Sequence, residues 1–339
     1  MMSSRNKRFQ LPPPTDPVLR AGLATGLDSA RSARTDQLAA FLAGACGDTT
    51  VAVVHYGSHA QHSEPRAESA HDFFVIVDRY RDAYRSLASR GVARFRPRVA
   101  TILNRLLAPN VIRVTVPGVT PALEGKCAVY SWSDFRLAAS PNARDHFALG
   151  RLFQHVQVAW TRDQERTERV VDLLIGARIA TFAWGSPYLP RQFDVDAYCR
   201  VLLETSFAAE IRPEGDERVD MLLAAQRATL IPVYTALLDQ LVQQRILARD
   251  GKVYTMVAPV GKWAKFRAAM YFRRSEVRAT TRWLKYIALY DDWLEYILQK
   301  IARRSGVSVE LTERERRWPL IFLWPKAIRF LRSRPQRRS

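Results

Sequence analysis

The sequence is short of cysteine, of acidic residues and of long apolar runs. Its three cysteines, Cys46, Cys127 and Cys199, lie far apart, and the lack of any CxxC spacing argues against a structural zinc site. So few cysteines fit a reducing compartment better than a disulfide-rich secreted protein. No uninterrupted apolar run reaches the length of about 18 residues that a membrane-spanning helix requires, so no transmembrane helix is expected.

The N-terminal segment also lacks the apolar core of a secretory signal peptide. Residues 1–20 are basic and rich in proline, and we expect them to form a flexible leader. Their arginine and serine content leaves a mitochondrial presequence open, although Pro12-Pro13-Pro14 opposes an amphipathic helix there.

The shortage of acidic residues gives the chain a strong positive charge. It has 52 Lys and Arg against 33 Asp and Glu, a formal net charge of +19. Such a charge favours anionic partners: nucleic acid, an anionic membrane surface or phosphorylated substrates. The chain has 339 residues, and its 47% hydrophobic content excludes a mainly disordered protein. We therefore expect two or three folded domains.

The most informative pattern is a Gly-Ser turn between two strand-like segments. Residues 51–56 are β-prone and end at Gly57-Ser58, and a second β-prone run, 71–78, contains Asp72 next to its start. Glycine lets the backbone approach a phosphate closely, and the following N–H groups and hydroxyl can bind its oxygens. Mg²⁺ prefers carboxylates together with triphosphate oxygens. Either feature alone is common, but the pair predicts a site for a nucleoside triphosphate and its metal.

The second metal carboxylate is not obvious. In a common nucleotidyltransferase pattern it stands two residues after the first, where this chain has Phe74. Asp78 has the right parity, but six residues of regular strand span roughly 20 Å, too far for one ion. The remaining candidates are Glu124 and Glu210.

Two further groups of residues surround this pattern. Lys126 opens a β-prone run, 127–131, and could offset triphosphate charge as a point cation. Four histidines gather around the turn, but their spacing fits no familiar zinc motif: His55, His59, His62 and His71. A polar loop containing histidines is the simpler interpretation.

The order of the elements predicts an α+β protein. Strands interleaved with helices indicate an α/β domain over 21–145, with a helix over 28–45, a largely helical stretch over 79–107 and a strand over 111–116. Helices then dominate the segment 146–262, and Asp250-Gly251 between β-prone runs predicts a hairpin. The expected helices are 145–158, 168–184, 194–209 and 219–247, the last possibly interrupted at Pro232. Helices followed by a hairpin indicate a winged-helix-like domain.

The last segment, 263–339, is the most basic and is expected to be helical. Residues 318–331 are apolar and aromatic, and an arginine cluster follows them. This composition suits a helix that lies in an anionic membrane interface. The alternative is a C-terminal helix packed on the protein core.

Five segments occur in the order and at the spacing of one known family. They are Tyr56-Gly57-Ser58, His71–Val75, Lys126–Ser131, Phe147–Leu152 and Leu203–Arg212. In these segments the chain resembles the mitochondrial translocator assembly and maintenance protein family, the soluble-type CDP-diacylglycerol synthases (phosphatidate cytidylyltransferases). The likeness spans about residues 50–290.

The resemblance implies a polymerase-beta-type nucleotidyltransferase domain, a winged-helix-like domain and a membrane-contacting C-terminal region. It also implies CTP and phosphatidic acid as substrates, with Mg²⁺ as cofactor, at the surface of a bacterial inner membrane or of the matrix side of a mitochondrial inner membrane. By matching position it gives candidate roles in substrate or metal binding to Gly57, Ser58, Asp72, Lys126, Gly150, Arg151, Glu210 and Arg212.

The chain also departs from the family pattern. Glu210 stands where the family has Asp, Ala209 where it has Gly, and Ala128 where it has Gly; Gln154-His155 replaces a Lys-Pro pair. These differences indicate a distant, perhaps bacterial, member.

Two other functions remain open at this point. One is a nucleotidyltransferase of the same fold with another acceptor, such as RNA, a small molecule or a protein. The other is a basic nucleic-acid-binding protein, whose aromatic residues among basic ones could stack on bases: Trp283, Tyr286, Tyr290 and Trp293. The lack of an RNP-like or zinc-finger motif weighs against the second.

Overall fold

A computed structural model describes residues 16–61, 70–92, 95–208, 216–289 and 312–313. The chain divides into two compact units, Met1–Arg282 and Trp283–Ser339, and the contacts described below lie within the first. This unit combines helices with a sheet that has both parallel and antiparallel pairs. The α+β class expected from the sequence is therefore confirmed.

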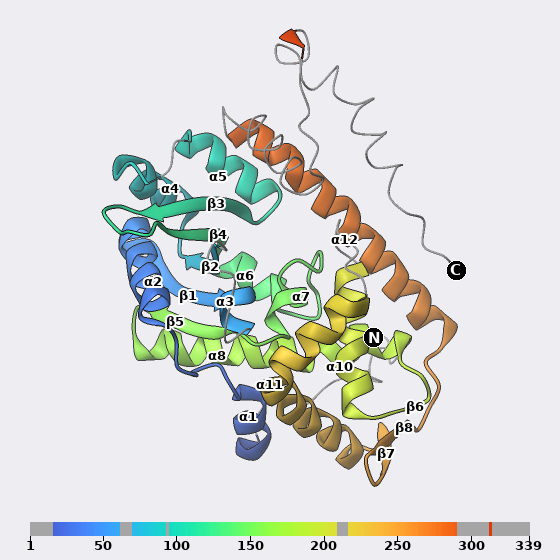
Figure 1. Cartoon of the computed structure of the whole chain (residues 1–339). Coiled ribbons are helices and arrows are strands. Elements are labelled where there is room, and N and C mark those ends of the chain that lie inside the picture. Colours follow the sequence, from blue (N-terminus) through green and yellow to red (C-terminus); the bar gives the residue numbers. More distant parts are fainter. Residues whose placement is uncertain (1–15, 62–69, 93–94, 209–215, 290–311, 314–339) are drawn as a thin grey trace, which may run out of the picture. The chain divides into compact units, whose positions relative to one another are not determined.

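A five-stranded sheet organises the first half of the chain (Figure 1). Its strands are β1 (Thr50–Tyr56), β2 (His71–Val77), β3 (Asn110–Val116), β4 (Leu123–Ser131) and β5 (Gln157–Thr161). They lie in the order β3-β4-β2-β1-β5; β2 and β4 are parallel, and the other three pairs are antiparallel. Almost every residue of β1 and β2 is buried, because both strands are central.

Helices cover both faces of this sheet. On one face lie α2 (Ala33–Cys46), α4 (Tyr80–Ser89) and α5 (Pro97–Leu106); on the other lie α6 (Trp132–Ala138) and α8 (Gln164–Ile179). The alternation of β3, in which buried residues alternate with residues that are exposed or half-buried, marks it as an edge strand with one uncovered face. The candidate site lies on that partly uncovered face.

Prolines set two helix boundaries that differ from those expected. The helical stretch expected over 79–107 is two helices, because Pro97 fits only the first turn of a helix and begins α5. Helix α1 (Pro17–Ala24) begins inside the segment expected to be a leader. Its first residue is again a proline, and the Asp16 side chain accepts a hydrogen bond from the backbone N–H of Val18.

The helix expected over 145–158 is wrong. Only α7 (Leu149–Leu152) is helical there, and β5 follows at once as the partner of β1. On its outer side, the N–H of Val158 donates to the carbonyl of Leu27. Tertiary partners for the backbone thus outweigh the helical spacing of the apolar residues. Strand β5 lies beyond the expected domain boundary at 145, yet it belongs to the same sheet as β1.

The remaining elements build a smaller three-stranded sheet with helices. They are α9 (Thr181–Gly185), β6 (Gln192–Phe193), α10 (Val195–Ala208), α11 (Asp216–Gln243), β7 (Leu247–Asp250) and β8 (Val253–Met256). The strands lie in the order β6-β8-β7. The hairpin expected at Asp250-Gly251 is confirmed, and Gly251 takes the positive φ of 56° that its turn requires.

Helix α11 runs on through Pro232, where an interruption was expected. Among the described residues, one helix, Glu217–Gln243, is long and apolar enough to cross a membrane. No such helix was expected, because the sequence has no unbroken apolar run of that length. Six side chains of this helix, between residues 230 and 241, are nevertheless buried in the core of the protein: Leu230, Val233, Tyr234, Leu237, Leu238 and Leu241. Core packing therefore accounts for its composition.

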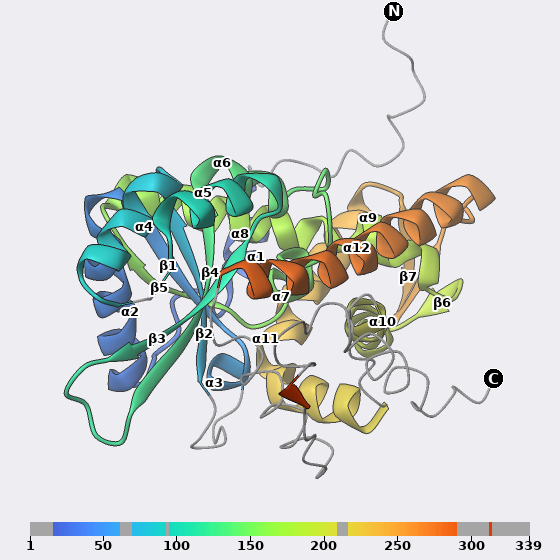
Figure 2. The same cartoon turned by 90° about the horizontal axis from the view of Figure 1, so that it is seen from above.

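Helix α12 (Lys262–Leu289) follows the hairpin and begins the basic segment (Figure 2). The helical prediction for this segment is confirmed as far as Leu289. The apolar and aromatic run 318–331 lies outside the described residues, so its prediction stays untested.

Candidate functional site

The Gly-Ser turn and Asp72 meet at one end of the central strands. β1 ends at Tyr56, which pairs with Asp72 of β2, and Ser58 begins the short helix α3 (Ser58–Gln61). Gly57 has a φ of 84°, and a Cβ on it would lie 2.6 Å from Oδ2 of Asp72. Glycine is therefore required here both by the backbone and by the neighbouring carboxylate. The two features that were fourteen residues apart in the sequence are in contact.

Strand register extends this pair into a row of charged side chains. Asp72 pairs with Lys126 of β4, and Lys126 pairs with Arg113 of β3. Paired residues on adjacent strands share a sheet face. Asp72 and Lys126 are half-buried and Arg113 is exposed, so the row is open to solvent. Because β4 begins at Leu123, Lys126 lies inside the strand and not at its start.

Glu124 lies on the same face as Lys126, two residues before it. Its Oε2 is 3.5 Å from Nη1 of Arg113, in a partly exposed ion pair. In the described ranges, no group of three or more His, Cys, Asp or Glu side chains could hold a metal ion. The other carboxylate candidate, Glu210, and Arg212 fall in 209–215, outside the described residues.

Two of the described candidate carboxylates lie on this sheet face. Asp72 places a carboxylate against the Gly57 turn, and Glu124 adds a second carboxylate on the same face. Mg²⁺ is usually held by one or two carboxylates together with substrate phosphates and water. Hard oxygen donors beside a glycine turn thus fit this ion better than they fit zinc or copper.

Arg151 approaches the row from α7. Its Nη1 donates to the carbonyl of Phe147 over 2.7 Å, and its guanidinium lies 4.1 Å from the Phe147 ring and 5.9 Å from the Tyr56 ring. Tyr56 in turn pairs with Asp72. The structure therefore joins Arg151 to the Gly57 turn through an aromatic contact.

Gly150 lies in α7, among buried side chains. It is itself buried, and a Cβ on it would lie 2.9 Å from Cδ2 of His146. Packing against this histidine ring is therefore one reason for a glycine here, and a role in phosphate binding stays a prediction.

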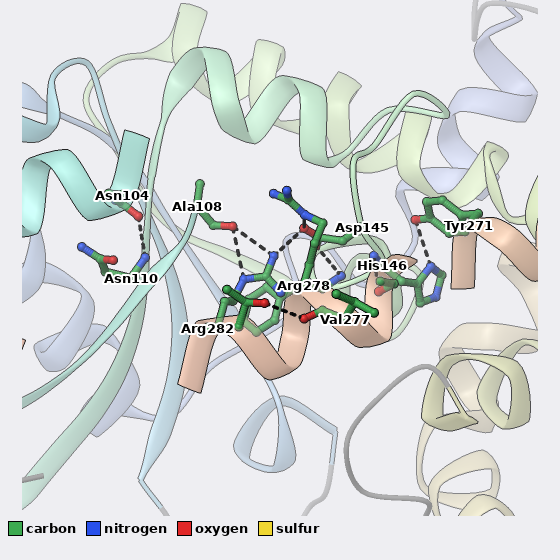
Figure 3. Close-up of polar contacts among 12 residues, drawn as sticks. Asn104, Ala108, Asn110, Asp145, His146, Tyr271, Val277, Arg278 and Arg282 are labelled. Carbon is green, nitrogen blue, oxygen red and sulfur yellow. Dashed lines mark hydrogen bonds and ion pairs between the residues drawn. The ribbon is translucent and has the colours of Figure 1, made fainter. Parts of the chain in front are cut away.

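A cluster of ion pairs formed by Asp145, Arg278 and Arg282 lies beside Phe147; Figure 3 shows its three members. Asp145 accepts hydrogen bonds from Nε of Arg278 over 2.8 Å and from Nη2 of Arg282, and Arg282 also donates to the carbonyl of Ala108. The guanidinium of Arg282 lies 4.9 Å from the Phe147 ring. Burial raises the pKa of the Asp145 carboxyl, but the charge and hydrogen bonds of the two arginines outweigh it, so this pKa lies below its ordinary value.

Sequence reasoning missed both Arg113 and this cluster. The alternation of 111–116 placed Arg113 on one face of a strand, but only the register shows that it is next to Lys126. Asp145 and Arg282 are 137 residues apart, and no local pattern connects them.

The three described histidines of this group lie in strands or a helix, which corrects the interpretation of a polar loop for them. His55 lies in β1, His71 in β2 and His59 in α3, where it stacks on His71 with 3.8 Å between ring centroids; His62 is outside the described residues. His71 precedes Asp72 directly, so it lies on the opposite sheet face. The Nδ1–H of His55 donates a hydrogen bond to Oε1 of Gln157 over 2.9 Å. His55 and His71 are buried and His59 is half-buried, and the two strand histidines lie on the sheet face opposite the charged row.

Burial lowers the pKa of four histidines: His55, His71, His146 and His155. The pKa of His55 falls to about 4 and that of His146 to about 3. Both pKa values lie below the value of about 6.5 in the unfolded chain. As the pH falls below about 6.5, these two side chains therefore bind protons in the unfolded chain but not in the native chain. Their contribution to stability is complete above about pH 7 and is lost as the pH falls toward the folded values.

We therefore expect His55 and His146 alone to lower the free energy of unfolding by about 4 kcal/mol between pH 7.5 and pH 5, about 2 kcal/mol each, and His71 to add to this fall. Urea unfolding at the two pH values measures this. His55→Asn keeps a donor for Gln157 but cannot titrate, so it should remove about 2 kcal/mol of the pH dependence. A stability that is flat across this range would contradict the assignment.

Comparison of the chain with protein-family models and with curated proteins finds no match. The functional argument therefore depends on the residues and their geometry.

Proposed function

We propose that this protein is a phosphatidate cytidylyltransferase: it transfers CMP from CTP to phosphatidic acid and releases CDP-diacylglycerol and pyrophosphate. The observation that carries the proposal is the contact between Gly57 and Asp72. It places a carboxylate directly beside a turn whose backbone can approach a phosphate. Lys126 on the adjacent parallel strand adds the cation that a triphosphate requires.

The arrangement of the strands supports the finer assignment of the fold. β1 ends in the Gly-Ser turn and is antiparallel to β2, which carries Asp72 and is parallel to β4, which carries Lys126. We propose that this mixed sheet is a polymerase-beta-type nucleotidyltransferase domain. The order α9-β6-α10-α11-β7-β8, with β8 in the middle of its sheet, fits a winged-helix-like domain in the same way.

In the proposed reaction an oxygen of the phosphatidate phosphate attacks the α-phosphorus of CTP. The bond from that phosphorus to the bridging oxygen breaks, and pyrophosphate leaves. The attacking phosphate monoester is already ionised near neutral pH, so no side chain has to act as a general base. The protein must position the two phosphates and offset their charge.

The residues around the Gly57 turn would have separate roles in this reaction. The turn at Gly57-Ser58 would hold triphosphate oxygens, and Lys126 and Arg151 would offset phosphate charge. Asp72, with Glu124 or Glu210 as a second carboxylate, would hold Mg²⁺. When bound, Mg²⁺ supplies charge stabilisation for the phosphoryl oxygens.

The proposal is tested by incubating the protein with each of four labelled nucleoside triphosphates, phosphatidic acid in mixed micelles and Mg²⁺. We expect a lipid-linked nucleotide to form from CTP and to disappear when a chelator is added. Diacylglycerol in place of phosphatidic acid is the control, because it lacks the attacking phosphate. Label transfer to RNA or to protein, with none to lipid, would instead identify a transferase of the same fold with another acceptor.

A further inference from the structure

Polar side chains of helix α12 hold it to the protein. The Ser275 hydroxyl accepts a hydrogen bond from the backbone N–H of His146 over 2.9 Å. The Tyr271 hydroxyl is 3.3 Å from Nδ1 of the same histidine, and further along the helix Arg278 and Arg282 bind Asp145 (Figure 3).

An apolar side chain, Phe272, packs against the core from the same face, with 4.9 Å between its ring centroid and that of His146. Hydrogen bonds and ion pairs thus share this face with the Phe272 ring, whereas most surface helices pack an apolar stripe inward.

The outward face carries the apolar side chains. Trp263, Phe266, Met270 and Val277 are 68%, 53%, 49% and 60% exposed. With 100° per residue, these four positions fall within an arc of about 60° on the helix. We call them the α12 stripe.

The stripe is a concentration of apolar surface and not a chance exposure. The described residues include eleven large hydrophobic side chains that are exposed, and six of them lie between 253 and 277: Val253, Val257 and the four of the stripe. Single exposed apolar residues are ordinary, but a contiguous group marks an interaction surface.

Basic side chains border the stripe. Arg267 and Arg274 are the nearest exposed cations on one side of its arc, and Lys262 and Arg273 on the other. No Asp or Glu occurs from Gly251 to Ser275. An apolar arc between two rows of cations is the pattern of a helix that inserts its side chains among lipid tails while its cations bind anionic headgroups.

We infer that the α12 stripe docks the protein on an anionic lipid bilayer. A nucleic acid would bind the cations, but Met270 and Val277 would contribute little to its binding because they cannot stack on bases. Cations along both borders of the stripe fit an anionic lipid surface better than they fit a protein partner or a second copy of the chain. The inference deepens the proposed function, and rests on it in one respect, because a lipid acceptor requires contact with a membrane.

The test is flotation of the full-length protein with vesicles of phosphatidylcholine, with and without phosphatidylglycerol, in the absence of CTP and phosphatidic acid. The stripe variant carries Trp263→Ser, Phe266→Ser and Met270→Ser. We expect wild type to bind the anionic vesicles, and the stripe variant to bind them at least about tenfold less tightly. The matched control carries Val18→Ser, Ile102→Ser and Met221→Ser, which remove three exposed apolar side chains elsewhere, and should bind within about twofold of wild type.

A third variant, Trp318→Ser with Trp324→Ser, examines the C-terminal run in the same assay. The inference is overturned if the stripe variant binds like wild type, or if the C-terminal variant alone abolishes binding. It is also overturned if the stripe substitutions dissociate a dimer in sedimentation or abolish binding to single-stranded RNA. The flotation assay contains no nucleotide, so its result does not depend on catalysis. If the protein bound vesicles through the stripe but formed no lipid-linked nucleotide in the transfer assay, the proposed function would be refuted and the docking surface would still be supported.

Discussion

Replacing Asp72 with Asn is expected to reduce CMP transfer about a thousandfold, equivalent to roughly 4 kcal/mol of transition-state stabilisation. The amide has the shape of the carboxylate but no charge, so it cannot hold Mg²⁺ beside the Gly57 turn. Asp72 is half-buried at a strand end. The melting temperature should therefore change little, and the loss should appear in kcat with CTP and phosphatidic acid saturating.

Asp78→Asn is the matched control for this experiment. Asp78 follows the other end of the same strand, and its Oδ2 binds Nη2 of Arg162 over 2.8 Å in a partly exposed ion pair. Such pairs contribute about 0–1 kcal/mol to stability, and Asp78 is six residues from Asp72. Transfer by this variant should stay within about twofold of wild type. If Asp72→Asn retained comparable turnover, the metal site would have to lie elsewhere.

Replacing Gly57 with Ala is expected to lower both activity and stability. A φ of 84° costs an L-residue about 1–2 kcal/mol. In addition, the new methyl group would lie 2.6 Å from Oδ2 of Asp72, a distance that forces the carboxylate or the turn to move. Displacement of about 1 Å at a reacting centre costs roughly a hundredfold in rate, and we expect a loss of that size in transfer.

Gly118→Ala separates the two causes. Gly118 has a φ of 73°, but nothing lies within 4 Å of a Cβ placed on it. This variant should lose the same 1–2 kcal/mol of unfolding free energy and keep wild-type transfer. Urea unfolding and the transfer assay on both variants give the comparison. Equal activity losses in the two variants would show that Gly57 is required only by its backbone.

Much of the fold could be predicted because its signals are local. The β-prone run that ends at Gly57, the helix that became α10 and the hairpin at Asp250-Gly251 each depend on residues close together in the sequence. The error at 145–158 has the opposite cause. Its apolar spacing is helical, but the backbone of β5 finds partners in β1 and at Leu27, which no window on the sequence contains.

The candidate site divides in the same way. The residue types at Gly57, Asp72 and Lys126 could be chosen from the sequence, because phosphate and metal chemistry restricts them. Their juxtaposition with Arg113 could not, because a shift of one residue in strand register would turn a side chain to the other face. The packing of Gly150 against His146 could not be predicted either, since it is a tertiary contact.

Residue types and their short-range spacing are enough to specify the chemical groups of this protein and its class of fold. These groups are a glycine turn, a strand carboxylate and a strong excess of cations. Three further features could be seen only in the folded chain: Gly57 lies against Asp72, Lys126 lies between Asp72 and Arg113, and the α12 stripe faces outward. Register and helix orientation depend on contacts between distant segments, and buried pairs such as Asp145 with Arg282 fix them.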